Sequence, residues 1–97
     1  MTNYSMYRQD DGVGDSGPLS DALYLTEDKS DVIYEHNAVP RVGVCMRVGS
    51  LTARSFTAHD WWQTSYITEI LEEENSTDYH RVKFKTKNSI YIWTRFL

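Results

Sequence analysis

The sequence predicts a mainly β fold, a small antiparallel barrel or a twisted sheet of five to six short strands with at most one short helix. Three observations predict it. Aromatic residues make up 13% of the chain, and many lie beside Val, Ile and Thr, which favour pleated strands. Residues 41–49 alternate between apolar and polar positions, as a half-buried strand does. Short runs of Gly, Asp, Asn and Ser separate the apolar segments, which is typical of turns.

The domain organisation follows from size and composition. The chain has 97 residues, 40% of them hydrophobic and 25% charged, which is the usage of one folded domain. We expect residues 1–20 to form a polar N-terminal arm or loop, and residues 21–97 to form a single β-rich domain. Residues 12–17 match the spacing of a dinucleotide-binding fingerprint, but Pro18 follows at once and no strand precedes, so we reject this interpretation.

The apolar pattern in the first half of the domain predicts a hairpin and a central strand. Apolar runs at residues 22–25 and 32–35 flank a segment that favours a turn. Residues 41–49 form the central strand, with Val42 and the apolar even-numbered residues after it on one face. Residues 51–56 continue as a short strand, and residues 58–63 resemble a capped helical turn.

The second half predicts three more elements. Residues 66–73 suit a strand, although the spacing of the apolar residues within 60–74 also suits a helical face. An acidic turn over 72–78 follows, and residues 79–87 and 90–96 form the last hairpin.

The register of this hairpin decides which side chains it displays. If only Asn88 and Ser89 lie in the loop, Phe84 faces Trp93. A three-residue loop or a bulge instead places Ile92 and Phe96 on the core side. We prefer the second register, because the first one mixes isoleucines with the lysines.

That preferred register places basic and aromatic side chains together on one exposed face. Such a face can bind single-stranded nucleic acid by phosphate contacts and base stacking. It can also be a solvated strand pair braced by cation–π contacts, which is commoner. Its residues are Lys83, Lys85, Lys87, Tyr91, Trp93 and Arg95.

Charge is segregated along the chain, although the net charge is only −4. Residues 60–78 carry six acids and no Lys or Arg, whereas residues 79–97 carry five Lys and Arg and no acid. Such segregation can steer a partner into an oriented encounter. The commoner explanation is that the opposed segments face each other across strands.

A protein-binding surface is the first functional hypothesis. Adjacent Trp61 and Trp62 cannot both point into one core, so one of them either anchors a partner or packs under the N-terminal arm. Acidic side chains can occupy a basic groove where phosphates would sit. The candidate partner-binding residues are Trp61, Trp62, Glu72, Glu73, Glu74 and Asp78.

Signatures of catalysis and of cofactor or metal binding are missing from the sequence. The three histidines lack zinc-like spacing, and no serine lies in a nucleophile elbow. Cys45, the only cysteine, reads as a buried, inert thiol. We expect no enzyme activity, no metal and no cofactor. No apolar run is long enough to cross a membrane and no signal peptide is recognisable, so we expect a cytoplasmic protein.

Residues 61–65, 68–70 and 84–91 resemble the C-terminal part of small accessory proteins of tailed bacteriophages, over roughly the last third of the chain. Members of this group with a known activity commonly bind and redirect or inhibit a host complex, including defence nucleases and polymerases. The resemblance implies a phage-encoded inhibitor or modulator of a host protein complex, acting in the host cytoplasm. Alternatives are a single-stranded nucleic-acid-binding domain and a structural virion or scaffold component.

Overall fold

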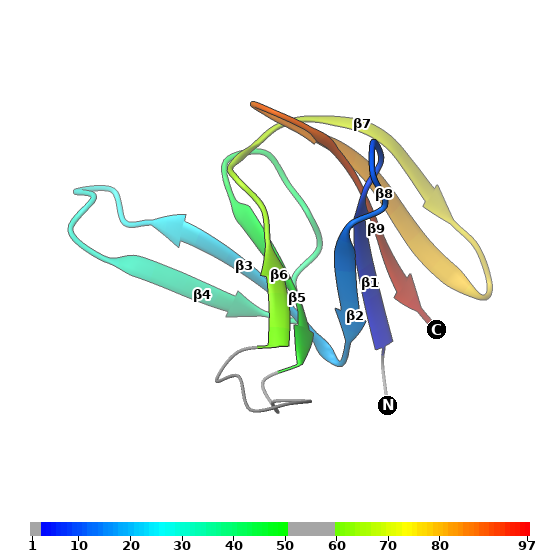
Figure 1. Cartoon of the computed structure of the whole chain (residues 1–97). Helices are drawn as coiled ribbons and strands as arrows, with labels where there is room; N and C mark the ends of the chain where they lie inside the picture. The colour runs from blue at the N-terminus through cyan, green and yellow to red at the C-terminus, as the bar shows by residue number, and fades with distance from the viewer. Residues whose placement is uncertain (1–2, 51–59) are drawn as a thin grey trace.

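The computed structural model describes the backbone of residues 3–50 and 60–97, and the side chains of 3–49 and 63–97. This part of the chain is mainly β, as predicted, and contains no helix (Figure 1). It forms two antiparallel sheets rather than a closed barrel, with more strands than expected. The strands are β1 (Asn3–Arg8), β2 (Gly14–Gly17), β3 (Leu19–Leu25), β4 (Val32–His36), β5 (Cys45–Ser50), β6 (Asp60–Gln63), β7 (Ile67–Asn75), β8 (Tyr79–Thr86) and β9 (Ile90–Phe96).

The larger sheet has the order β2-β1-β9-β8-β7, and the smaller has the order β4-β3-β5-β6. The N-terminal segment is therefore not a loop or arm over residues 3–17. Tyr4 and Met6 are buried on one side of β1 while Tyr7 is exposed on the other, and β1 pairs with β9 along its whole length. A short alternating run among polar residues was enough for a strand, because a neighbouring strand supplied its hydrogen bonds.

The two sheets are joined where the chain passes from one to the other. β2 pairs with β1 in the larger sheet, and two residues later Leu19 pairs with Gly49 in the smaller one. At this corner a Cβ on Gly17 would lie 2.4 Å from the Gly49 carbonyl oxygen, so only glycine fits. At the opposite corner, the Ile67 N–H at the start of β7 donates to the Val44 carbonyl at 2.8 Å. Strands that change sheets in this way give a sandwich with shared corners.

One apolar core fills the space between the sheets. Its largest member, Trp93, is fully buried on β9, and its indole N–H donates to Ser20 Oγ of β3 at 2.9 Å. Ser20 Oγ in turn donates to the Ala38 carbonyl at 3.0 Å. The core consists of Tyr4, Met6, Ala22, Ala38, Val44, Met46, Val48, Ile67, Val82, Phe84, Tyr91 and Trp93.

The register preferred for the last hairpin is wrong. The Thr86 N–H donates to the Ser89 carbonyl at 2.9 Å, which leaves Lys87 and Asn88 as the loop. Val82 then lies opposite Trp93, and Lys83 lies opposite Ile92. Trp93 turns inward because Ser20, on the other sheet, satisfies its indole N–H.

Other predicted elements are confirmed or shifted. The hairpin of residues 22–25 and 32–35 is confirmed as β3 and β4, with the register Leu23 opposite Tyr34. The central strand begins only at Cys45, and Val42 is exposed in the turn before it.

The remaining predicted elements lie between residues 51 and 78. Residues 60–63 are a strand instead of a helical turn, while the strand expected at 51–56 lies outside the described residues. Residues 67–75 are a strand and not a helix, so the acidic turn is confined to 76–78.

Candidate functional site

The outward side of the larger sheet is a surface formed by adjacent strands, and we call it the open face. Residues directly opposite each other in an antiparallel sheet share one side. Tyr7, Ile92 and Lys83 lie opposite one another in adjacent strands, which fixes the side to which each row belongs. Its side chains are exposed or half-buried except for Thr94. The rows are Glu69, Glu72 and Glu74 on β7; Arg81, Lys83 and Lys85 on β8; Ile90, Ile92, Thr94 and Phe96 on β9; and Ser5 and Tyr7 on β1.

The acidic and basic rows of the open face are matched residue for residue. Glu69 lies opposite Lys85, Glu72 opposite Lys83 and Glu74 opposite Arg81. Two register shifts in β7, between residues 67 and 69 and between residues 70 and 72, keep these glutamates on the same side as the bases. The opposed charge segments of the sequence therefore face each other across strands.

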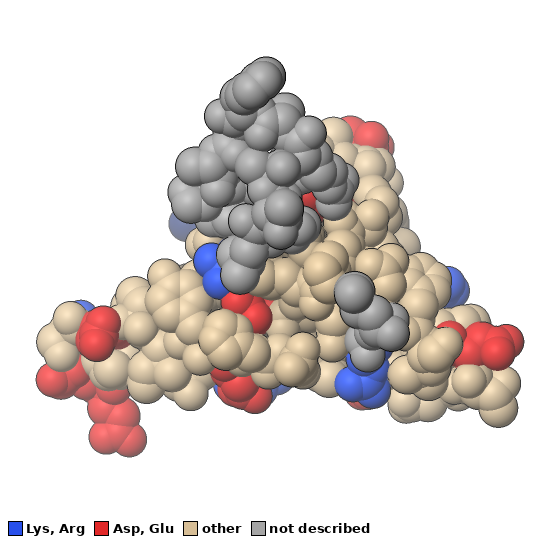
Figure 2. All heavy atoms as spheres, turned by 90° about the horizontal axis from the view of Figure 1, so that it is seen from below, with Lys and Arg blue, Asp and Glu red and all other residues tan. Residues whose placement is uncertain are grey.

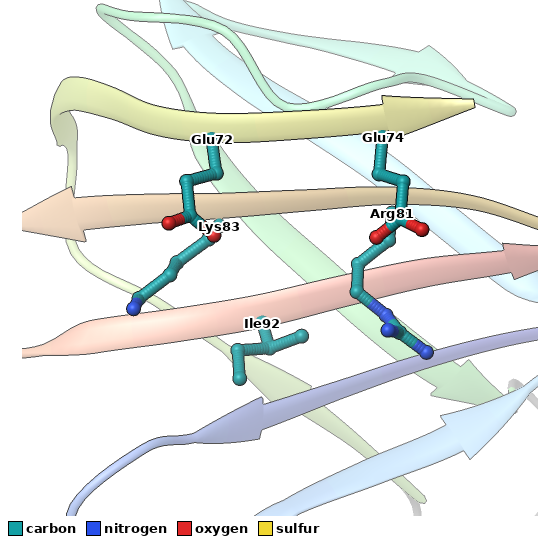
Figure 3. A pocket seen from close by; sticks show the side chains of 5 residues that line it. All are labelled: Glu72, Glu74, Arg81, Lys83 and Ile92. Carbon is teal, nitrogen blue, oxygen red and sulfur yellow. The ribbon is translucent and has the colours of Figure 1, made fainter.

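A shallow hollow lies over these rows. Its volume is about 210 Å³, and it is lined by two glutamates, two bases and one isoleucine from three adjacent strands (Figure 3). The lining residues are Glu72, Glu74, Arg81, Lys83 and Ile92. Pockets that hold small molecules usually enclose about 300–1,000 Å³, so this hollow is better suited to receiving a side chain of a partner.

One end of the basic row is held in place by contacts with its neighbours. The Tyr79 hydroxyl donates to Glu74 Oε1 at 2.5 Å, and this hydrogen bond raises the pKa of Tyr79. The Arg81 guanidinium lies over the Tyr79 ring, 4.5 Å from its centroid. Arg81 thus presents its charge next to Glu74 from a restrained position.

Two of the acidic candidates from the sequence are not on the open face. Glu73 points to the other side of β7, where its carboxylate lies 2.7 Å from Nε2 of the buried His80. Asp78 lies in the turn before β8, and its carbonyl accepts from the Leu97 N–H at 2.9 Å. The structure brings together only Glu72 and Glu74 of the predicted acidic set.

The basic and aromatic face expected on the last hairpin does not form. Lys83 and Lys85 are on the open face, but Tyr91 and Trp93 are buried on the opposite side of β9. Lys87 is in the hairpin loop, and the half-buried Arg95 shares the side of Trp93. The aromatic rings are stacked in the core, with Phe84 and Tyr91 at a centroid distance of 5.6 Å, so they cannot stack on bases.

In place of those rings, an apolar band runs beside the basic row. Phe96 is exposed at one end of the band on β9, and Ile92 and Ile90 are half-buried farther along it. The exposed Tyr7 of β1 lies opposite Ile92. Sequence reasoning missed Tyr7, because residues 1–20 were expected to be an arm. The alternation of Tyr4, Met6 and their polar neighbours was the signal that could have placed it on a strand.

Trp61 and Trp62 lie in β6 at the edge of the smaller sheet, where Trp62 is opposite Val48 in the register. Their side chains, and so the predicted surface anchor, lie outside the described part of the structure.

Among residues 3–49 and 63–97, no group of three His, Cys, Asp or Glu side chains could hold a metal ion. Cys45 is buried, and burial raises the pKa of its thiol. An unperturbed or raised thiol pKa disfavours the thiolate that a nucleophile needs.

The described segments also hold no helix long and apolar enough to cross a membrane. Comparison of the chain with protein-family models, with curated proteins and with solved structures finds no match.

Proposed function

We propose that this chain is a non-enzymatic protein-interaction module that docks through the open face of its larger sheet. The observation that carries the proposal is the apolar band of Tyr7, Ile90, Ile92 and Phe96 lying beside charged rows on an ordered sheet surface. Protein interfaces have this anatomy, with an apolar centre and a charged or polar rim. Tyr7 and Arg81 are also of the residue types that dominate binding energies.

The charge balance of this face favours a protein over a nucleic acid. Binding to a phosphate backbone is driven by several unopposed Lys and Arg side chains that release counterions. On the open face, each base of β8 lies opposite a glutamate of β7. A balanced face of this kind gains little from a polyanion but can match a partner that carries both signs of charge.

The partner's chemistry follows from the order of the rows. Its apolar side chains would cover Ile92 and Phe96, its carboxylates would face Arg81 and Lys83, and its bases would face Glu72 and Glu74. The resemblance to phage accessory proteins supports a host complex as the target, with the chain acting as its inhibitor or modulator. Binding then blocks or redirects the host complex with no chemistry on this chain.

Affinity capture from a bacterial host lysate, with and without nuclease, tests the proposal. We expect a protein partner that nuclease does not remove, and we expect Tyr7→Ala combined with Ile92→Lys to lower its binding at least about 10-fold in calorimetry. Val42→Lys is the matched control, because Val42 is exposed on the turn before β5 and is not part of the open face. Far-ultraviolet circular dichroism verifies that each variant folds.

Two results would count against the proposal. Capture that nuclease abolishes would point to a nucleic-acid ligand. Equal binding by the open-face variant and by the Val42→Lys control would mean that another surface carries the interaction.

A further inference from the structure

The β3–β4 hairpin projects from the body of the protein, and its outer strand is an edge (Figure 1). Within residues 3–50 and 60–97, β5 pairs with β3 only over Leu19–Leu23, and β4 pairs with no strand other than β3. All five residues of β4 are exposed. In the described part of the chain, the outer edge of β4 is therefore an unpaired, solvent-exposed strand edge.

This edge lacks the features that usually prevent strand pairing. Val32, Ile33 and Tyr34 are 40%, 41% and 50% exposed, although all three are large and apolar. Edge strands are commonly protected by Lys, Pro or a bulge. β4 contains neither residue, and its pairing with β3 is regular. Its only acidic residue, Glu35, already pairs with Arg41 at 2.6 Å.

The backbone groups that are free to pair can be identified. The Thr26 N–H donates to the Asp31 carbonyl at 3.0 Å. Thr26 and Asp31 are therefore a hydrogen-bonded residue pair at the loop end of the hairpin. Hydrogen-bonded and non-hydrogen-bonded pairs alternate in an antiparallel ladder. The N–H and C=O groups of Val32, Tyr34 and His36 therefore point away from β3, toward the free edge.

We propose that a second copy of this chain pairs with that edge, β4 against β4, antiparallel about a two-fold axis at Tyr34. The pairing is isologous, so it closes into a dimer and cannot grow into a fibre. It joins the two four-stranded sheets into one continuous sheet. It uses a surface separate from the open face, so its failure would leave the proposed function intact.

Charge selects the register of this pairing. Centred on Tyr34, the whole of β4 overlaps, with Val32 opposite His36 of the second copy and Ile33 opposite its Glu35. A register centred on Ile33 would place Asp31 opposite Glu35, and one centred on Glu35 would place two Glu35 carboxylates face to face. Like charges directly opposite each other destabilise a sheet. The Tyr34-centred register alone among these three keeps acids apart.

The hairpin tips fit the same arrangement. The tip carries exposed acidic side chains, seen at the far left of Figure 2, including Glu27, Asp28 and Asp31. An antiparallel pairing directs the two tips away from each other, so their charges do not meet. At the centre, each Tyr34 ring is supported by Arg47 of its own chain, whose guanidinium lies 5.2 Å from the ring centroid.

Sedimentation equilibrium of the full chain tests whether the dimer exists. We expect a dissociation constant on the order of 10 µM, the weak affinity typical of a small interface. Val32→Lys adds an edge charge and should weaken the dimer at least about 10-fold. Val42→Lys, which changes an exposed valine off the edge, should leave it unchanged.

Disulfide trapping tests the register. In a Cys45→Ser background oxidised with diamide, Tyr34→Cys should form a covalent dimer, because hydrogen-bonded partners across the axis lie about 5.5 Å apart at Cα. Val32→Cys, opposite His36 of the second copy, should not. A chain that stays monomeric at about 1 mM, far above the expected dissociation constant, would overturn the proposal. Equal trapping at both positions would also overturn it.

Discussion

Replacing Ser20 by Ala should destabilise the protein far more than its small volume suggests. Ser20 Oγ accepts from Trp93 Nε1 at 2.9 Å and donates to the Ala38 carbonyl at 3.0 Å, and all three residues are buried. The change removes both hydrogen bonds. Loss of the one to Ala38 costs about 1 kcal/mol, and loss of the other leaves an indole N–H buried without its acceptor, at about 1–3 kcal/mol. We expect a loss of about 2–4 kcal/mol in the free energy of unfolding.

Urea unfolding followed by far-ultraviolet circular dichroism measures this loss, and the melting temperature should fall by roughly 10–20 °C. A Trp93→Phe background isolates the hydrogen bond. There Ser20→Ala should cost only about 1 kcal/mol, since no indole N–H remains to be stranded. Ser65→Ala, at an exposed serine, is the matched control and should be nearly neutral.

An equal cost of Ser20→Ala in both backgrounds would contradict this expectation. That result would mean that Trp93 does not depend on Ser20 for its hydrogen bond. It would also reopen the register of the last hairpin, in which Trp93 faces the core and lies opposite Val82.

Three further predictions follow from single contacts. Gly17→Ala should lower the free energy of unfolding, measured in urea, by about 1–3 kcal/mol or more, because the new Cβ would lie 2.4 Å from the Gly49 carbonyl oxygen. An unchanged urea midpoint would mean that this corner between the sheets opens easily. Hydrogen bonds from Thr26, and to a lesser extent from Ser30, lower the pKa of Asp28 from 3.8 to about 2. The Asp28 carboxylate therefore stabilises the folded state fully above pH 3.8, and this contribution is lost as the pH falls through about 2. Carbon-detected NMR titration should give that midpoint, and Thr26→Val should raise it. Cys45 should react with a thiol reagent much more slowly in the folded protein than in urea, because it is buried and its pKa is raised; equal rates would place the thiol at the surface.

The strands of the second half could be predicted because their alternation is strong. Val82, Phe84 and Thr86 are buried, while the Lys83 and Lys85 between them are half-buried and exposed, as the alternation of the sequence indicates. β9 alternates equally well, but both of its sides carry large apolar side chains, so its pattern does not say which side is buried. The hairpin loop does not determine the buried side of β9 either, because loops of two and of three residues both fit the sequence.

The candidate site could also be predicted only in part, because the sequence does not determine the register between strands. Glu72 and Glu74 are exposed and Lys83 is half-buried on the open face. Their placement opposite one another depends on the β7–β8 register and its two shifts, which the sequence does not show. Tyr7 was missed because β1 owes its place inside the larger sheet to β9, a strand more than 80 residues later in the chain, as well as to its neighbour β2.

By itself, the sequence determined that this protein is built from strands, since side-chain alternation and β-branched residues act locally along the chain. Tertiary structure decided the division into two sheets, the side of β9 that is buried and the residues that share the open face. These depend on contacts between distant residues, such as Trp93 with Ser20 and Gly17 with Gly49. Burial and hydrogen-bond satisfaction across such contacts outweigh local preference, because the cost of a stranded buried donor exceeds most differences in strand propensity.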